Sequence, residues 1–116
     1  MPGSLSHVEI GVADAPQSLV FFQRLFDWSP QRLGATEEAW LQTPSIRVGV
    51  HGDDPQSRMV VYFRVSDMAD SVSRVRALGG QAGDISPHEP GFGRFCQCHD
   101  PQGVCFGLHQ PDPLES

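Results

Sequence analysis

The first side chains that could do chemistry stand near the start of the chain, in a segment with the pattern of a strand. His7 and Glu9 alternate there with the apolar residues Val8, Ile10 and Val12, which is the two-residue period of a half-buried strand. One face of this strand would pack in the core, and the other would carry an imidazole and a carboxylate. These groups can accept hydrogen bonds or protons, and a histidine can also bind a metal ion.

A second group that could do chemistry lies in the last quarter of the chain. Cys96, Cys98 and His99, with Cys105, invite a zinc interpretation, but structural zinc sites usually combine two separate ligand pairs with spacings of two to four residues. We therefore favour ordinary packing of small apolar side chains. His99 beside Asp100 would suit either general-base chemistry or a turn histidine bonded to the loop. Three cysteines do not form a secreted disulfide framework, so we expect reduced thiols.

These residues belong to two copies of one strand–helix–strands unit, because the chain repeats itself. Val12 matches Val65 and Asp14 matches Asp67 at an offset of 53 positions. The ends of the two halves match at an offset of 58 positions, residues 46–51 against residues 104–109. Each copy is only about 50 residues long, which is too short to bury enough apolar surface alone.

Length and composition agree with one small domain over residues 1–116, with modules at about 4–52 and about 58–110. A chain of 116 residues with 39% apolar residues can supply one core. Its net charge of −6 comes without a basic run, so nucleic acid is not an expected partner. The chain lacks a signal-like start and any apolar run near ~20 residues, so we expect a cytoplasmic protein with no membrane partner.

The first half is predicted to place a helix after its first strand. Asp14 is a good N-cap and Pro16 fits the first turn, so the helix should run to about Trp28. Its apolar residues recur at helical spacing and would cover the apolar face of the first strand. Short strands are predicted near residues 31–34, 38–43 and 46–51.

The second half repeats this order with a longer loop. A strand is predicted over residues 59–65, followed by a helix that is capped by Asp67 and stopped by Gly79 and Gly80. Its buried stripe is predicted to be Met68, Val72, Val75 and Leu78. Residues 82–93 are rich in glycine and proline and are typical of a strand plus a mobile loop that borders a site. The last two strands are predicted to form an antiparallel hairpin, residues 94–99 with residues 104–110.

Four stretches of the chain carry a family resemblance: Ser6-His7-Val8-Glu9-Ile10-Gly11-Val12-Ala13-Asp14, Val65-Ser66-Asp67, Ala77-Leu78-Gly79-Gly80, and residues 98–108 with the turn Asp100-Pro101-Gln102-Gly103. Together they resemble the vicinal oxygen chelate superfamily, also called the glyoxalase/bleomycin resistance/dioxygenase superfamily, over roughly residues 5–110. The ending over residues 106–110 is similar to its uncharacterised glyoxalase-like branch. The resemblance implies an α+β fold in which two βαβββ modules form a cup-shaped, mixed eight-stranded sheet with helices outside. It also implies a homodimer.

The resemblance also indicates where a metal would bind. Metal-dependent members place one ligand on the first and last strand of each module, which corresponds here to His7, Gly49, Val60 and Gly107. Only His7 has a donor side chain, whereas a catalytic divalent ion needs about three protein ligands. We therefore expect no metal and no cofactor. The alternative is a divalent metal at a displaced site, bound by His7 with His51 or His109.

Strand alternation would still give the cup a polar inner face. The residues that share strand parity with His7 and Gly49 form the expected ligand-binding set: His7, Glu9, Arg47, His51, Tyr62, Arg64, Cys105 and His109. Arg47 or Arg64 would hold an anionic group. Tyr62 would contribute a ring and a hydroxyl, and Glu9 would accept hydrogen bonds or protons. The alternative is an open sheet face that is merely solvated.

We therefore expect a small-molecule-binding protein of the glyoxalase and bleomycin-resistance type, with no catalytic residue assigned. Two other functions remain open. One is a metal-dependent glyoxalase-like lyase, isomerase or dioxygenase with an atypical metal site. The other is an interaction module with a vestigial cup. Binding is favoured because the metal-ligand positions are lost while the inner face stays polar.

Overall fold

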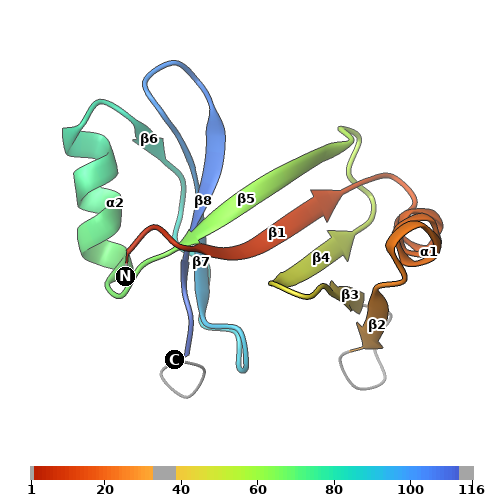
Figure 1. The fold of residues 1–116 in the computed structure, drawn as a ribbon. Helices are drawn as coiled ribbons and strands as arrows, with labels where there is room; N and C mark the ends of the chain where they lie inside the picture. The colour runs from red at the N-terminus through yellow and green to blue at the C-terminus, as the bar shows by residue number, and fades with distance from the viewer. Residues whose placement is uncertain (1, 33–38, 113–116) are drawn as a thin grey trace. The chain divides into compact units, whose positions relative to one another are not determined.

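The computed structural model describes residues 2–32 and 39–112, and its ribbon is drawn in Figure 1. The chain divides into two compact units. The first unit is His7–Val60. The second unit combines the short N-terminal segment before His7 with the part of the chain that begins at Val61.

The first unit contains one helix and the strands that pack with it. In chain order these are β1 (Leu5–Gly11), α1 (Ala15–Phe26), β2 (Ser29–Arg32), β3 (Ala39–Gln42) and β4 (Arg47–His51). The strands are ordered β2-β3-β4-β1, and only β1 and β4 are parallel. Parts of the two strands predicted near 31–34 and 38–43 lie outside the described residues.

Helix α1 begins and ends where its local chemistry requires. The Asp14 side chain accepts a hydrogen bond from the backbone N–H of Gln17 at 3.2 Å, which satisfies one of the unpaired donors of the first turn. The helix ends at Phe26, slightly before the predicted Trp28, because Asp27 turns left-handed with φ 59°. Apolar residues of α1 then pack on a core from three strands: Ile10, Leu41, Val48 and Val50.

The second unit repeats the same topology. Its elements are β5 (Arg58–Arg64), α2 (Met68–Ala77), β6 (Gln81–Ala82), β7 (Arg94–His99) and β8 (Cys105–Gln110). The strands are ordered β5-β8-β7-β6, with β5 and β8 parallel and the other pairs antiparallel. Each first strand therefore lies beside its own last strand. The expected α+β class, with two βαβββ modules and mixed strand pairing, is confirmed.

The second core explains the cysteines and corrects one residue of the predicted helix stripe. Cys96 and Cys98 are buried with other apolar residues of this unit, so the interpretation of these two cysteines as core packing is confirmed. Leu78 was expected in the buried stripe but is 74% exposed. It is the C-cap of α2, and the chain turns away at Gly79 with φ 90°, so its side chain leaves the packed face. Neither described helix is long and apolar enough to cross a membrane.

Candidate functional site

Strands β1 and β4 bring the polar residues of the first unit onto one face. His7 pairs with Arg47, and Glu9 pairs with Gly49. His51 pairs with Gly11 in the same register. Side chains of paired residues point to the same side of a sheet. The structure therefore places four members of the expected ligand-binding set together: His7, Glu9, Arg47 and His51.

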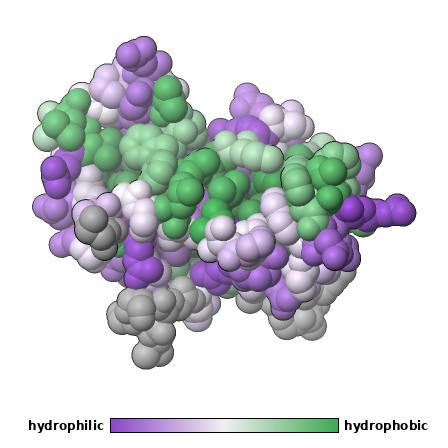
Figure 2. All heavy atoms as spheres, in the orientation of Figure 1, coloured by the Kyte–Doolittle hydropathy of each residue, from purple (hydrophilic) through white to green (hydrophobic). Residues whose placement is uncertain are grey.

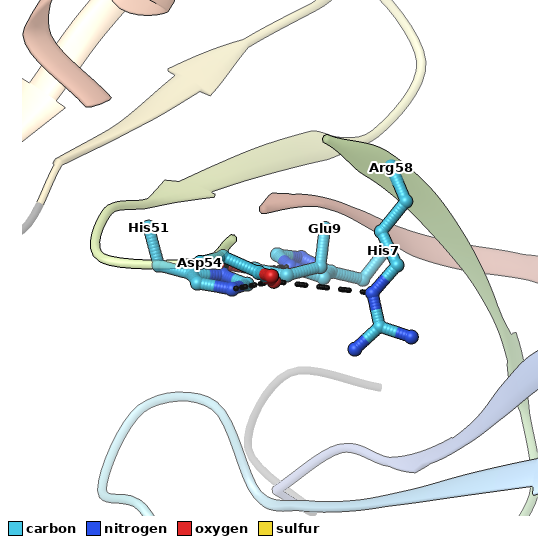
Figure 3. A network of polar contacts seen from close by, with 5 residues as sticks. All are labelled: His7, Glu9, His51, Asp54 and Arg58. Carbon is cyan, nitrogen blue, oxygen red and sulfur yellow. Dashed lines mark hydrogen bonds and ion pairs between the residues drawn. The ribbon is translucent and has the colours of Figure 1, made fainter. Parts of the chain in front are cut away.

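A chain of polar contacts crosses this face (Figure 3). The two oxygens of Glu9 are bound by two imidazoles, with 2.9 Å from Oε1 to His7 Nε2 and 2.6 Å from Oε2 to His51 Nδ1. The other nitrogen of His51 lies 3.2 Å from Asp54 Oδ2. Carboxylates only accept, so both ring nitrogens of His51 donate and the ring is an imidazolium in this arrangement. Arg58 Nε lies farther out, 3.9 Å from Asp54 Oδ2.

The carboxylate of Glu9 reaches this place because position 49 has no side chain. A Cβ added to Gly49 would overlap Glu9 Oε1 and would lie 3.0 Å from His7 Nε2. Position 49 is where the family resemblance implies a ligand on the last strand. Here a carboxylate does occupy that space, but it comes from the first strand. Gly11 makes similar room, since a Cβ there would overlap the Asp54 carboxylate.

The contacts shift the acidity of the groups in opposite directions. Burial raises the pKa of Glu9, but the hydrogen bonds from His7 and His51 outweigh it, and the net pKa is lowered. Burial lowers the pKa of His51, but the carboxylates of Glu9 and Asp54 outweigh it and raise the net pKa. The pKa of Asp54 is lowered, first by the backbone N–H of Gln56 and then by His51. The group therefore holds two carboxylates around a cation.

Arg47 is held by an aromatic ring on the same face. Its guanidinium carbon lies 5.5 Å from the centroid of the Trp40 ring. Trp40 pairs with Gly49 on the other side of β4, so it lies in the row that also contains Glu9. A guanidinium over an indole face is attracted by the ring quadrupole. The arrangement orients the Arg47 guanidinium on the face that also carries Glu9.

In the second unit, too, a side chain of the first strand fills the space over a glycine of the last strand, but there the side chain is a tyrosine. Tyr62 pairs with Gly107, and a Cβ at Gly107 would overlap the Tyr62 ring. Tyr62 also meets the ring of Phe95 edge-on at 5.4 Å between centroids. The offsets of 53 and 58 positions make Tyr62 the counterpart of Glu9, and Gly107 the counterpart of Gly49. The two modules thus present a phenol and a carboxylate at matched places.

His109 is buried and uses both ring nitrogens within the second unit. Nε2 contacts the carbonyl oxygen of Phe92, and a carbonyl only accepts, so Nε2 carries the hydrogen. Nδ1 then accepts from the hydroxyl of Ser6. The ring also stacks on Phe95 with 4.4 Å between centroids. Neither nitrogen is left to coordinate a metal in this arrangement.

Two further members of the expected ligand-binding set lie on the strands of the second unit. Arg64 is on β5, paired with His109. Cys105 is on β8, and its sulfur accepts a hydrogen bond from Gln97 Nε2 at 3.0 Å. Gln97 also lines a cleft of about 450 Å³. The cleft is formed by β6, the loop after β6, and β7: Gln81, Ala82, Gly83, Asp84, Gln97 and His99.

Asp54 belongs to the polar group around Glu9 and His51, and sequence reasoning missed it. It lies in the polar turn after β4, which has the composition of a linker, and it folds back onto His51. Its Oδ1 also accepts from the backbone N–H of Gln56 at 2.9 Å. The sequence feature that could have indicated this contact is Gly11, because an isolated glycine inside a strand often marks a place where another group approaches the backbone closely.

The donor set does not fit the metal site of the metal-dependent relatives. Three of the four matched positions are Gly49, Val60 and Gly107, which have no donor atom. Within residues 2–32 and 39–112, no group of three or more His, Cys, Asp or Glu side chains is arranged to hold a metal ion. Burial raises the pKa of the Cys98 thiol to about 12, as expected for a cysteine packed in the core.

Comparison with known proteins identifies the family. The model of the glyoxalase-like domain matches residues 7–109, and the chain belongs to this family. The expected membership of the vicinal oxygen chelate superfamily is thereby confirmed. The putative glyoxylase CFP32 of Mycobacterium bovis and the protein of that name from Mycobacterium tuberculosis are each 36% identical over 55 residues. That match covers 47% of this chain and 21% of each relative, so the match spans about a fifth of the curated relatives.

Solved structures show the same fold. Methylmalonyl-CoA epimerase from Mycobacterium tuberculosis superposes with a TM-score of 0.73 at 20% identity, covering 97% of this chain and 90% of that one. The hypothetical protein BH1468 from Bacillus halodurans gives 0.73 at 14% identity, with 95% of each chain covered. A variant of the Streptomyces coelicolor methylmalonyl-CoA epimerase in complex with 2-nitronate-propionyl-CoA gives 0.71 at 15%, covering 96% and 99%. At these identities the likeness shows the fold alone.

Proposed function

We propose that this glyoxalase-like chain binds a compact small molecule on the polar face of β1 and β4. The observation that carries the proposal is the Glu9 carboxylate, which lies over Gly49 and is fixed by the imidazoles of His7 and His51. Its side chain stays 26% exposed, so a ligand can still reach its oxygens. A fixed acceptor on a rigid sheet is suited to orienting a hydrogen-bond donor.

Arg47 gives the ligand a second feature. Its guanidinium is pre-oriented over Trp40, and a guanidinium fork favours planar oxygen acceptors. We therefore expect an anionic or carbonyl group at Arg47 and a donor or acidic hydrogen near Glu9. Solved epimerases of this fold hold methylmalonyl-CoA or 2-nitronate-propionyl-CoA, which also carry such oxygen groups. We propose Tyr62, Arg64, Cys105 and His109 as further ligand-binding residues of the second unit.

A second candidate function is proton transfer, as in a glyoxalase-like isomerase or lyase. The observation that favours it is the Glu9 carboxylate, which is held by two imidazoles while its side chain stays 26% exposed. Glu9 could take a proton from a ligand and release it directly to solvent, because both ring nitrogens of His51 already carry hydrogens and cannot accept it. This candidate needs no metal.

With the binding function we further propose that residues 1–116 form one domain, that the chain sequesters its ligand as in bleomycin resistance, and that it is located in the cytoplasm.

A ligand screen with matched arginine variants tests the proposal. Metabolites that raise the melting temperature would be titrated by calorimetry into the parent chain and into Arg47→Met, Arg64→Met and the control Arg74→Met. Arg74 lies on the exposed surface of α2. Loss of one charge-assisted contact should weaken binding by about 1.5–3 kcal/mol, roughly ten- to a hundredfold. Confirmed ligands that bind every variant as tightly as the parent would refute the proposed site.

Glu9→Gln separates the two candidates. The amide keeps one oxygen acceptor but cannot take up a proton, so a binding protein should lose only part of its affinity. A proton-transfer enzyme should instead keep affinity and lose exchange of the ligand's acidic hydrogen with deuterated water. The exchange would be followed by NMR with a confirmed ligand. Exchange that is equally fast in Glu9→Gln would exclude the second candidate.

A further inference from the structure

The cleft at β6 and β7 lies on the side of these strands that is turned away from the core of the second unit. Along β7, Gln97 and His99 alternate with Cys96 and Cys98, which are buried in that core. Successive side chains of a strand point to opposite faces, so Gln97 and His99 point away from the core. Gln81 shares their side, because it pairs with His99. The cleft volume of about 450 Å³ lies within the roughly 300–1,000 Å³ of small-molecule sites.

The side chains that line this cleft offer acceptors that the fold does not use. Gln97 donates through Nε2 to the sulfur of Cys105 at 3.0 Å, so its carbonyl oxygen Oε1 is left for a ligand. Within residues 2–32 and 39–112, the side chains of Gln81, Asp84 and His99 form no hydrogen bond or ion pair. Carboxylate and amide oxygens accept hydrogen bonds, and a neutral imidazole accepts at one nitrogen. The cleft is therefore suited to a ligand with several donors.

The acidic residues in and near the cleft give it a negative charge. Asp84 is the one carboxylate among the described residues that line it, and none of these is a lysine or an arginine. The neighbouring Asp100 is used within its own turn, where its carboxylate accepts from the backbone N–H groups of Gln102 and Val104. Figure 2 shows hydrophilic residues at the top of the view, where Figure 1 draws this turn. Asp84 is therefore the carboxylate that remains for a ligand.

Arg76 is the cation that approaches the cleft from α2. Its Nη2 donates to the carbonyl oxygen of Ala82 at 3.3 Å, so the guanidinium is held on the backbone of β6. Arg76 is not one of the residues that line the cleft, and it leaves the Asp84 carboxylate without a positive partner. The whole chain has a net charge of −6, and a negative field of this kind attracts cations.

We propose that the cleft binds a small cation that carries a primary amine and a hydroxyl group. An ammonium group has three donors and no acceptor, and its hydrogen bond to the Asp84 carboxylate is charge-assisted and therefore stronger than a neutral one. The hydroxyl group donates to Gln97 Oε1. This site goes beyond the function proposed above, in which Arg47 of the first unit holds an anionic or carbonyl group. The two sites prefer ligands of opposite charge.

Three probes of similar size and different charge test this proposal. Ethanolamine carries the ammonium and the hydroxyl group, ethylene glycol has a second hydroxyl group in place of the ammonium, and glycolate has a carboxylate in its place. Each probe is titrated into the full chain, labelled with ¹⁵N, at constant ionic strength and about pH 8, which favours neutral imidazoles. Binding is measured from the NMR shifts of the backbone and side-chain amides.

Ethanolamine should bind most tightly of the three probes. A molecule this small should have a dissociation constant on the order of 10 mM. Ethylene glycol should bind at least about threefold more weakly, which is the strength of a partly exposed ion pair, and glycolate should bind more weakly still. The shift changes should include the side-chain amides of Gln81 and Gln97 and the backbone amide of Gly83.

Matched variants identify the residue that binds the ammonium group. Asp84→Asn keeps the size of the side chain and removes its charge, so it should weaken ethanolamine binding at least about threefold. Asp27→Asn is the control, because it removes the same charge at an exposed residue of the first unit. Asp27 is left-handed at the C-cap of α1, a conformation that asparagine also adopts, so ethanolamine binding should be unchanged.

Four results would overturn the proposal. These are the absence of saturable shifts with ethanolamine, equal binding of glycolate or ethylene glycol, an Asp84→Asn variant that binds like the parent or no more weakly than Asp27→Asn, and shift changes that cluster around Glu9 and not at the cleft. If the amide spectrum shows that Asp84→Asn does not fold, Gln81→Glu replaces it. This variant adds a carboxylate and should strengthen ethanolamine binding at least about twofold, and unchanged binding would refute the site.

The outcome is distinguishable from that of the proposed function. None of the residues that line the cleft belongs to the ligand-binding set, and ethanolamine lacks the anionic or carbonyl group expected at Arg47. Arg47→Met should therefore bind ethanolamine like the parent chain, whichever ligand the face of β1 and β4 holds.

Discussion

The position of the Glu9 carboxylate depends on the missing side chain at Gly49. Gly49→Ala would put a methyl group on an oxygen of Glu9, so either the carboxylate leaves the imidazoles or the strands shift. We expect a loss of about 1–3 kcal/mol in the free energy of unfolding, measured by urea denaturation. Gly52→Ala is the control, because a Cβ there would make only ordinary contacts, the nearest at 3.5 Å.

A double-mutant cycle identifies the cause of that loss. In a Glu9→Ala background the carboxylate is gone, so Gly49→Ala should cost clearly less than it does in the parent chain. An equal cost in both backgrounds would mean that the glycine is needed for the backbone and not for Glu9.

The pKa shifts of His51 and Glu9 predict how stability depends on pH. The folded pKa of His51 lies above its ordinary value of 6.5, so its contribution is full below pH 6.5 and is lost as the pH rises through the folded pKa. The folded pKa of Glu9 lies below 4.5, so its contribution is present above pH 4.5 and is lost as the pH falls through the folded pKa. Together they place the most stable range between pH 4.5 and 6.5.

His51→Asn tests the upper side of this range. The variant cannot be protonated, so the decline of the free energy of unfolding above pH 6.5 should be weaker than in the parent chain. Urea is the suitable denaturant, because it does not screen charges. An identical decline in both proteins would assign it to other groups.

At the scale of single elements, the caps of the two helices make separate contributions. The Asp67 side chain accepts from the backbone N–H of Asp70 at 3.0 Å. Removing this cap with Asp67→Ala should cost about 1 kcal/mol, measured by thermal or urea unfolding. Ser66→Ala is the matched control, since Ser66 is exposed and lies one residue before the cap. An equal loss in the control would show that the segment, and not the cap, is sensitive.

The elements were predictable because each depends on local chemistry. Helix starts followed from Asp14 and Asp67, and the strand faces followed from two-residue alternation, so the shared face of His7, Glu9, Arg47 and His51 could be expected. Asp54 could not, because its role depends on where a turn folds back in space. The end of α2 was also missed, since periodicity does not show that Leu78 leaves the helix at the cap.

At the scale of the whole molecule, a metal would need donors from the first and last strands of both modules. With Gly49, Val60 and Gly107 at three matched positions, added Ni²⁺, Zn²⁺ or Fe²⁺ should hardly change the melting temperature, because stabilisation requires preferential binding to the native state. Differential scanning fluorimetry with each ion provides the measurement. A saturable, stoichiometric increase that His7→Ala abolishes would contradict this prediction.

Gly49 and Gly107, the matched glycines of the two modules, limit how the sequence of such a chain can change. Because Glu9 fills the space over Gly49 and Tyr62 fills the space over Gly107, the chemistry of each module can be changed at one residue of its first strand. The glycine opposite it must stay small for as long as that residue is large. Related sequences that regain a glutamate at position 49 should therefore have a small residue at position 9, and the same exchange should link positions 107 and 62.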